Sequence, residues 1–214
     1  MKAIMSRGTA LMALALAAVA VPQARAADIM KEWASVKLPP PPELKPVTLE
    51  GKTTALLILD VMKGSCARRV RCTEMLPNLK KLHDAARAAG AMVFYTLVGG
   101  SNPTAADVAA GLTPKEGEWV FQRGPDKFLG SPLEQRLKEH GIKTVIVTGT
   151  SAQGVGIGTG SGSAQRGYNV IVPVDGLASD DAFMELYAIY HLAKGGPAIV
   201  TEKVTLTRTD MIKF

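Results

Sequence analysis

The sequence contains few of the residues that bind metal ions or build disulfide frameworks. Its 214 residues include two cysteines, Cys66 and Cys72, and three histidines, at positions 83, 140 and 191, that fit no zinc-ligand spacing. We therefore expect no metal site and no cofactor. In an oxidising compartment, two cysteines that bracket a short polar stretch predict a structural disulfide. A catalytic or redox pair and a metal site are weaker alternatives, because the spacing is not CxxC and no histidine is near.

The sequence also lacks the common nucleotide-binding and serine-hydrolase motifs. Glycine occupies every second position from 154 to 162, but the run has no GxGxxG register, and GxxxxGK[ST] does not occur. The GSGSA segment at 160–164 does not match GxSxG. Each glycine weakens a helix by on the order of 1 kcal/mol relative to alanine. Two explanations stay open: backbone N–H groups that bind an anion or oxyanion, and close packing against a sheet.

The excess of charge is small. The formal net charge is +6, but the first 26 residues have the pattern of a signal peptide. Lys2 and Arg7 precede an apolar run that is too short to span a bilayer, and Ala24-Arg25-Ala26 predicts cleavage after Ala26. Cleavage leaves 22 basic and 19 acidic residues, a net charge of +3. We expect a periplasmic or secreted protein with no nucleic-acid partner, and no membrane association after cleavage.

Residues 27–50 are predicted to form an arm outside the main domain. A short predicted helix is followed by four consecutive prolines, which impose a polyproline II conformation. The arm is either a spacer or a segment that lies across the domain or a neighbouring subunit. From 51 to 214, strand and helix patterns alternate, which predicts one α/β domain.

Apolar and β-branched runs predict strands at 54–60, 91–98, 119–122, 145–147, 170–174 and 198–201. Helical spacing and capping residues predict helices at about 73–90, 131–141 and 180–194. The last helix is expected to turn Phe183, Leu186, Tyr187, Tyr190 and Ala193 inward, and residues 204–214 to form a tail. Continuous apolar strands joined by crossovers predict a parallel sheet covered on both faces, with the ligand site beyond the carboxyl ends of its strands.

Asp60 is the most informative single residue. It ends the first apolar run, TALLILD, and is therefore expected at the ligand-bearing edge of the sheet. A carboxylate that is partly shielded there can donate or accept a proton. The structural alternatives are a cap on the following loop and an ion pair with one of the arginines at 68, 69 and 71.

Four segments in order resemble the isochorismatase-like, or cysteine hydrolase, superfamily: LLILD at 56–60, PDKFLGSPLEQRL at 125–137, VIVTGT at 145–150 and RGYNVIVPVDG at 166–176. The similarity extends from about residue 54 to 201. It implies a three-layer, Rossmann-like α/β fold with a six-stranded parallel sheet. It also implies a homo-oligomer and a small-molecule substrate.

The amidases of that superfamily use an Asp-Lys-Cys triad. Asp60 matches the family aspartate. The family's spacing puts Gln122 at the lysine position, with Lys127 close by but out of register. Counting six residues on from Gly149 puts Val155 at the cysteine position, which argues against thiol catalysis. Members that hydrolyse vinyl ethers also lack the cysteine, because the aspartate protonates the substrate.

The resemblance further implies a substrate pocket that includes Thr150, Ser151, Gly154, Val155 and Gly156, with a non-proline cis peptide between the first two. Two hypotheses follow. In the first, the protein is a hydrolase in which the carboxylate at position 60 is general acid or base, the amide at position 122 and the backbone polarise the substrate, and water is the nucleophile. In the second, it is an inactive member that serves as a small-molecule binding or assembly module.

Overall fold

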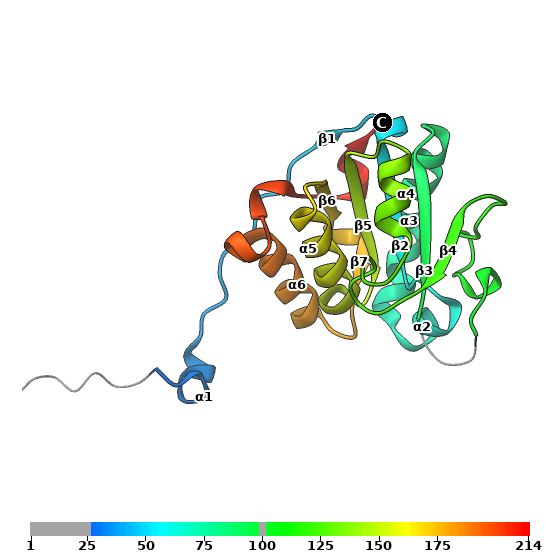
Figure 1. Ribbon diagram of the computed structural model, residues 1–214. Coiled ribbons are helices and arrows are strands. Elements are labelled where there is room, and N and C mark those ends of the chain that lie inside the picture. Colours follow the sequence, from blue (N-terminus) through cyan, green and yellow to red (C-terminus); the bar gives the residue numbers. More distant parts are fainter. Residues whose placement is uncertain (1–26, 99–101) are drawn as a thin grey trace, which may run out of the picture. The chain divides into compact units, whose positions relative to one another are not determined.

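The computed structural model describes residues 27–98 and 102–214, and the chain divides into two compact units after Pro39 (Figure 1). The predicted signal peptide and its cleavage site lie in residues 1–26, outside the described residues. Within the described residues, no helix is long and apolar enough to cross a membrane.

The described part of the first unit, residues 27–39, contains one turn of α-helix. Helix α1 spans Ile29–Glu32 and begins where the Asp28 carboxylate accepts a hydrogen bond from the Met30 N–H. A 3-10 turn at Trp33–Ser35 follows, and the chain is then extended through the prolines. The predicted N-terminal helix is therefore present but short.

The second unit is built on a parallel sheet. Its strands are β2 (Thr54–Leu59), β3 (Met92–Leu97), β4 (Trp119–Gln122), β5 (Thr144–Thr150), β6 (Asn169–Pro173) and β8 (Val204–Thr207), in the order β4-β3-β2-β5-β6-β8. Every neighbouring pair is parallel. The predicted six-stranded parallel sheet is confirmed. Two additions are β7 (Leu177–Ala178), which pairs with the end of β5, and a separate pair formed by β1 (Val47–Thr48) and β9 (Ile212–Lys213).

Helices cover both faces of this sheet (Figure 1). Helices α2 (Lys63–Arg68) and α3 (Val70–Ala88) lie on one face, and α4 (Leu133–Glu139), α5 (Ile157–Gln165) and α6 (Ala182–Lys194) lie on the other. Successive side chains of a strand point to opposite faces, so Leu57 packs with the α4–α6 layer and Leu56 with the α3 layer. All six residues of β2 are buried, as expected for a central parallel strand.

The predicted last strand at 198–201 is wrong. Residues Gly196–Ala198 and Thr201–Lys203 form 3-10 turns, and Val200 between them has a left-handed φ of 55°. The N–H groups of Ile199 and Val200 donate back to the carbonyls of Gly196 and Pro197, at 3.0 and 3.3 Å, so this stretch turns and does not pair with a strand. The sixth strand is β8, within the segment that was expected to be a tail.

The predicted inner face of the last helix is also largely wrong. Ala188 and Leu192 are the buried residues of α6, and Ala193 is partly buried. Phe183, Leu186, Tyr187 and Tyr190 are instead exposed to between 36% and 54%. The physical reason is the partner helix: α5 is made of small residues, and a Cβ at Gly160 would lie 3.1 Å from a methyl carbon of Leu192. Small residues let the two helices approach closely, and that leaves no room for aromatic rings between them.

Cys66 and Cys72 form a disulfide, as predicted. The cysteines lie in helices rather than in the expected loop, because α3 begins at Val70 instead of about residue 73. Thr73 supports the junction by donating a side-chain hydrogen bond to the Cys66 carbonyl at 3.0 Å. The disulfide therefore ties α2 to the first turn of α3.

Candidate active site

Asp60 lies at the carboxyl edge of the sheet, directly after β2. Its backbone has a left-handed φ of 56°, and its N–H donates to the backbone carbonyl of Thr96 at 3.1 Å. The Thr96 hydroxyl in turn donates to Oδ1 of Asp60 at 2.6 Å. The carboxylate is 2% exposed and points into the protein at the end of the two central strands. The position predicted for it from the strand pattern is confirmed.

Lys127 supplies the cation at this carboxylate. Its Nζ atom donates to Oδ1 of Asp60 at 2.9 Å and to Oδ2 at 2.8 Å. The third ammonium proton points to the backbone carbonyl of Arg123, at 3.0 Å. Both side chains are almost fully buried. Since all three protons of the ammonium group have acceptors, the pair satisfies the condition under which buried charges are tolerated.

This geometry corrects the expectation that Lys127 is out of register and that Gln122 stands in its place. Gln122 ends β4, opposite Leu97 of β3, and its side chain is exposed. Lys127 lies in the loop between β4 and α4, and its side chain reaches the carboxylate of Asp60 from that loop. Counting residues from the family motif identifies the residue at the end of β4, but it does not show where the side chains of the following loop lie.

The glycine-rich helix α5 holds this loop in place. A Cβ atom at Gly158 would lie 2.9 Å from the carbonyl carbon and oxygen of Pro125, and one at Gly162 would lie 2.9 Å from a carboxylate oxygen of Asp126. Real Cβ atoms essentially never approach backbone so closely, so glycine is what lets the loop lie against α5. These contacts are close packing, but against the loop at 125–126 and not, as the second explanation had it, against the sheet.

Hydrogen bonds complete the support of Lys127. Thr159 is fully buried between the two glycines; its hydroxyl accepts the Lys127 N–H at 3.3 Å and donates to the Pro125 carbonyl at 3.0 Å. The Ser131 hydroxyl donates to the carbonyl of Lys127 from the other side. The lysine backbone is therefore held at both its N–H and its carbonyl.

The turn predicted to line the pocket follows β5. A cis peptide joins Thr150 and Ser151, where the family resemblance implied one, and residues Ala152–Gly156 form a π-helical turn. Parallel pairing of Leu59 with Gly149 makes Asp60 and Thr150 the next residues along the two central strands. The Thr150 hydroxyl is buried and forms no hydrogen bond with the described residues. It is therefore a polar group that a bound molecule could satisfy.

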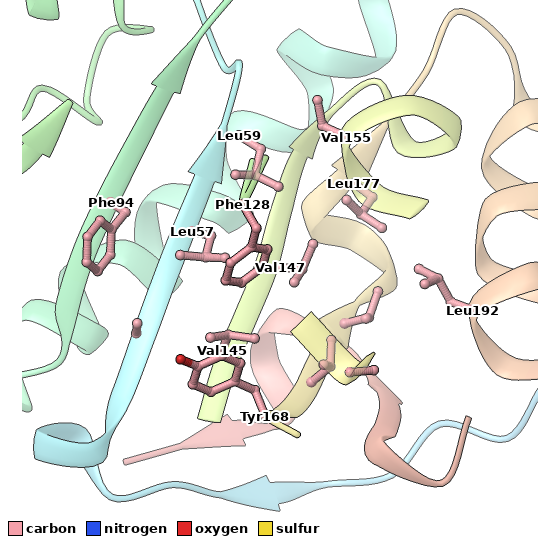
Figure 2. Packing of buried hydrophobic residues seen from close by; sticks show 14 of the residues in the cluster. Leu57, Leu59, Phe94, Phe128, Val145, Val147, Val155, Tyr168, Leu177 and Leu192 are labelled. Atoms are coloured by element: carbon pink, nitrogen blue, oxygen red, sulfur yellow. The ribbon is translucent and has the colours of Figure 1, made fainter. Parts of the chain in front are cut away.

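Val155 lies in the hydrophobic core beside this turn. It is 5% exposed and clusters with Leu59 and Leu177, and Figure 2 shows these residues at the same end of β5. Ser179 stabilises the turn by accepting the Ala152 N–H at 3.1 Å. An apolar, covered side chain cannot act as a nucleophile. Among the described residues, no group of three or more His, Cys, Asp or Glu side chains could hold a metal ion.

Sequence reasoning missed a second polar cluster, which is buried or partly buried between α3 and β3. His83 Nε2 lies 2.8 Å from the hydroxyl of Tyr95, which also accepts a 2.7 Å hydrogen bond from Arg87. Arg87 forms a two-bond ion pair with Glu118 at 2.8 and 2.5 Å. Burial raises the pKa of Tyr95 and lowers the pKa of His83. Through Glu118, the cluster ties the end of the segment that connects β3 to β4 to both α3 and β3.

Thr96 and Thr159, which contact the Asp60–Lys127 pair, were also missed. Thr96 is a polar residue inside an otherwise apolar strand, and Thr159 stands between glycines; both were visible in the sequence. No local sequence pattern marks either threonine as part of the site, because each forms its hydrogen bond with a residue more than thirty positions away.

Comparison with known proteins gives one consistent result. The family sequence model called the isochorismatase domain matches residues 54–203 of this chain. A secreted isochorismatase effector of Verticillium dahliae is 28% identical over 148 residues, covering 64% of this chain and 78% of the relative. An N-carbamoylsarcosine amidase of Arthrobacter is 30% identical over 125 residues, or 46% of this chain and 47% of the amidase.

Solved structures agree on the fold. The crystal structure of an isochorismatase family protein from Desulfovibrio vulgaris superposes with a TM-score of 0.64 at 23% identity, covering 74% of this chain and 95% of that one. At this identity the likeness supports the architecture of the sheet and its helices rather than a shared substrate.

Proposed function

This chain belongs to the isochorismatase family, and we propose that it is a hydrolase of small polar molecules that works without a thiol nucleophile. The observation that carries the proposal is the contact of Lys127 Nζ with both carboxylate oxygens of Asp60, at the edge of the sheet where parallel α/β folds bind ligands. With Val155 at the family's cysteine position, two of the three triad groups remain.

In the proposed reaction Asp60 acts as general base and then as general acid. A water molecule attacks the electrophilic carbon of an amide, ureide or ester while Asp60 takes its proton, and the proton then passes to the leaving nitrogen or oxygen. For an enol ether, Asp60 in its acid form instead gives its proton to the double bond and takes one back from the water that adds to the resulting cation, and the hemiacetal so formed separates into a carbonyl compound and an alcohol. Lys127 holds the carboxylate in position and offers positive charge to the oxygen on which negative charge develops.

The Thr150–Gly156 turn supplies the remaining polar group, the unbonded hydroxyl of Thr150, which is proposed to orient the substrate. The N–H groups of Gly154 and Gly156 already donate to the Ser151 carbonyl, at 3.1 and 3.4 Å, and hold the turn. In this proposal Lys127, which contacts the carboxylate of Asp60, polarises the substrate in place of Gln122.

Access to the site requires movement of the residues that cover it. Asp60 is 2% exposed and Lys127 is fully buried. The segment that connects β3 to β4 contributes to the cover, because Ala109 donates its N–H at 2.9 Å to the carbonyl of Val61, the residue that follows Asp60. Substrate binding is therefore proposed to displace this segment or the Lys127 loop.

The test is a turnover screen of the mature protein over amides, ureides, esters and enol ethers. Asp60→Asn is the inactive comparison, because the amide cannot take the proton. Asp210→Asn is the matched control, since it makes the same chemical change at a side chain that is 72% exposed on the surface. Turnover that is lost in Asp60→Asn and kept in Asp210→Asn supports the proposal; turnover that survives Asp60→Asn contradicts it.

The second candidate function is a catalytically inactive binding or assembly module. The complete burial of the ion pair favours it, because a structural salt bridge needs no access to substrate. A separate cavity of about 290 Å³, lined by residues that include Asn78, Asp175 and Arg208, offers space for a small polar ligand. No turnover on any substrate, together with ligand binding that survives Asp60→Asn, would establish this function instead.

Export is the remaining part of the proposal. The signal pattern and the Cys66–Cys72 disulfide support a periplasmic or secreted location, and the relative from Verticillium dahliae is described as secreted. N-terminal sequencing of the protein from the extracytoplasmic fraction should begin at Ala27. Recovery of the uncut chain from the cytoplasm would contradict this location.

A further inference from the structure

The cavity between α3 and the segment that follows β8 lies apart from the candidate active site. Its volume is about 290 Å³, and none of the residues that line it belongs to that site. An engineered apolar cavity of about 150 Å³ holds a benzene molecule, so this cavity has room for a ligand with a ring-sized body. Its apolar surface comes from Leu82 and Ala85 of α3 and from Ile212 of β9.

Two cations also line the cavity: Lys81 on α3, and Arg208 directly after β8. Within the residues that the structure describes, the side chain of Lys81 forms no hydrogen bond or ion pair. The guanidinium group of Arg208 lies 3.5 Å from a carboxylate oxygen of Asp175 and 3.4 Å from one of Asp210, and both distances exceed those of N–H···O hydrogen bonds. Both cations therefore still have N–H groups to donate to an anion.

The two acidic neighbours do not need the arginine. Oδ1 of Asp175 accepts the Thr209 N–H at 2.8 Å, and Oδ2 accepts the Thr209 hydroxyl at 2.8 Å and the side-chain amide of Asn78 at 3.4 Å. The side chain of Asp210 is 72% exposed, and ion pairs at such positions stabilise a protein little. An incoming anion can therefore bind Arg208 without leaving a buried carboxylate unpaired.

We propose that this cavity binds a small organic carboxylate. The carboxylate group of the ligand accepts hydrogen bonds from Lys81 and Arg208, since the planar fork of an arginine matches a carboxylate through two parallel bonds. The body of the ligand covers Leu82 and Ile212. The apolar surface favours such a ligand over inorganic phosphate, which would leave that surface in contact with water. Because the cavity is separate from Asp60, the inference does not depend on whether the protein is a hydrolase.

The first test is an NMR titration of the isotopically labelled mature protein with phenylacetate as the probe. The amide signals of Asn78, Lys81 and Thr209 should shift and saturate, with a dissociation constant of about 1 mM or lower. Acetate and phosphate have the charge without the ring, and phenylethanol has the ring without the charge. Each of the three should bind at least about tenfold more weakly than phenylacetate.

The second test uses variants at the cavity. Lys81→Gln and Arg208→Gln should each raise the dissociation constant of phenylacetate about tenfold, the effect of losing one charge-assisted hydrogen bond. Ala85→Leu fills the cavity without changing a charge and should also weaken binding. All three positions are exposed, so the variants should fold normally, which circular dichroism verifies. Lys52→Gln, at an exposed lysine outside the cavity, is the matched control and should bind like the wild type.

Four results would overturn the proposal. They are the absence of saturable shifts with phenylacetate, shifts centred on Asp60 and Thr150 instead of the cavity, equally tight binding of phosphate or phenylethanol, and binding that survives all three cavity variants. Equally tight binding of phosphate would identify a plain anion site in place of a carboxylate site. The turnover screen tests a different set of residues, so its failure and the failure of this proposal are distinguishable.

Discussion

Lys127 Nζ lies 2.8 Å from Oδ2 and 2.9 Å from Oδ1 of Asp60, although the two residues are 67 positions apart in the sequence. Each charge is removed from water, and each is compensated chiefly by the other. The pair is therefore important to the stability of the fold, whether or not the protein turns over a substrate.

Removing Lys127 alone should be strongly destabilising. Lys127→Met leaves the buried carboxylate without its cation, and the free energy of unfolding should fall by about 3–5 kcal/mol. Adding Asp60→Asn should recover part of that loss, because the second charge is then also absent. Urea denaturation measures both. Lys138→Met, at a lysine side chain that is 67% exposed, should change the stability by no more than about 0.5 kcal/mol. Equal losses at the two lysines would contradict the interpretation.

Gly158→Ala should displace the loop that carries Lys127. The new methyl group would lie 2.9 Å from the Pro125 backbone, which cannot move aside as a side chain could. We expect a loss of about 1–3 kcal/mol of stability from overpacking, and a lower turnover of any substrate found. Gly64→Ala is the matched control: it also lies in a helix, but its Cβ would have only an arginine side-chain nitrogen near, at 3.8 Å. That control should be neutral or stabilising by up to about 1 kcal/mol.

The disulfide should make a modest contribution to stability. It closes a loop of about seven residues, for which the chain-entropy estimate is about 2 kcal/mol. Reduction should lower the urea midpoint of the wild-type protein, whereas a Cys66→Ser/Cys72→Ser variant should be less stable and insensitive to reductant. Thiol titration of the unreduced, denatured wild-type protein should detect no free thiol; detection of two would rule out the bond in solution.

Stability should fall as the pH is lowered below about 6.5 because of His83. Burial lowers the pKa of His83 in the folded state, while the hydrogen bond with Asp84 opposes the shift. The unfolded chain then binds a proton that the folded one does not, so stability is full above the unfolded pKa and is lost as the pH falls, by up to about 1.4 kcal/mol per pH unit. The other groups that act on the His83 ring are the charges of Arg87 and Glu118 and the hydroxyl of Tyr95.

Urea denaturation between pH 7 and pH 5 measures this slope. His83→Gln should reduce it, because glutamine does not titrate. His140→Gln changes an exposed histidine at the end of α4 and should leave the slope unchanged. A slope that persists in His83→Gln would assign the pH dependence to another group.

Most of the sheet was predictable, since its strands are continuous apolar runs. Burial on both faces removes the alternation that an exposed face would impose, and the runs around Leu57 and Val147 are therefore unambiguous. The predictions were wrong where the residue types of a segment favoured one structure and its packing in the fold required another. Residues 198–200 are apolar but contain a left-handed Val200, and the large side chains of α6 are exposed because the small residues of α5 bring the two helices close together.

By itself the sequence determined the class of the fold, the place of Asp60 at a strand end, the disulfide and the absence of a thiol at position 155. All of these depend on residue type and on position along one segment. Only the tertiary structure decided which cation meets the carboxylate. Lys127 reaches Asp60 because Gly158 and Gly162 let a distant loop lie against α5, and a contact between three separate segments leaves no periodic signal in any one of them.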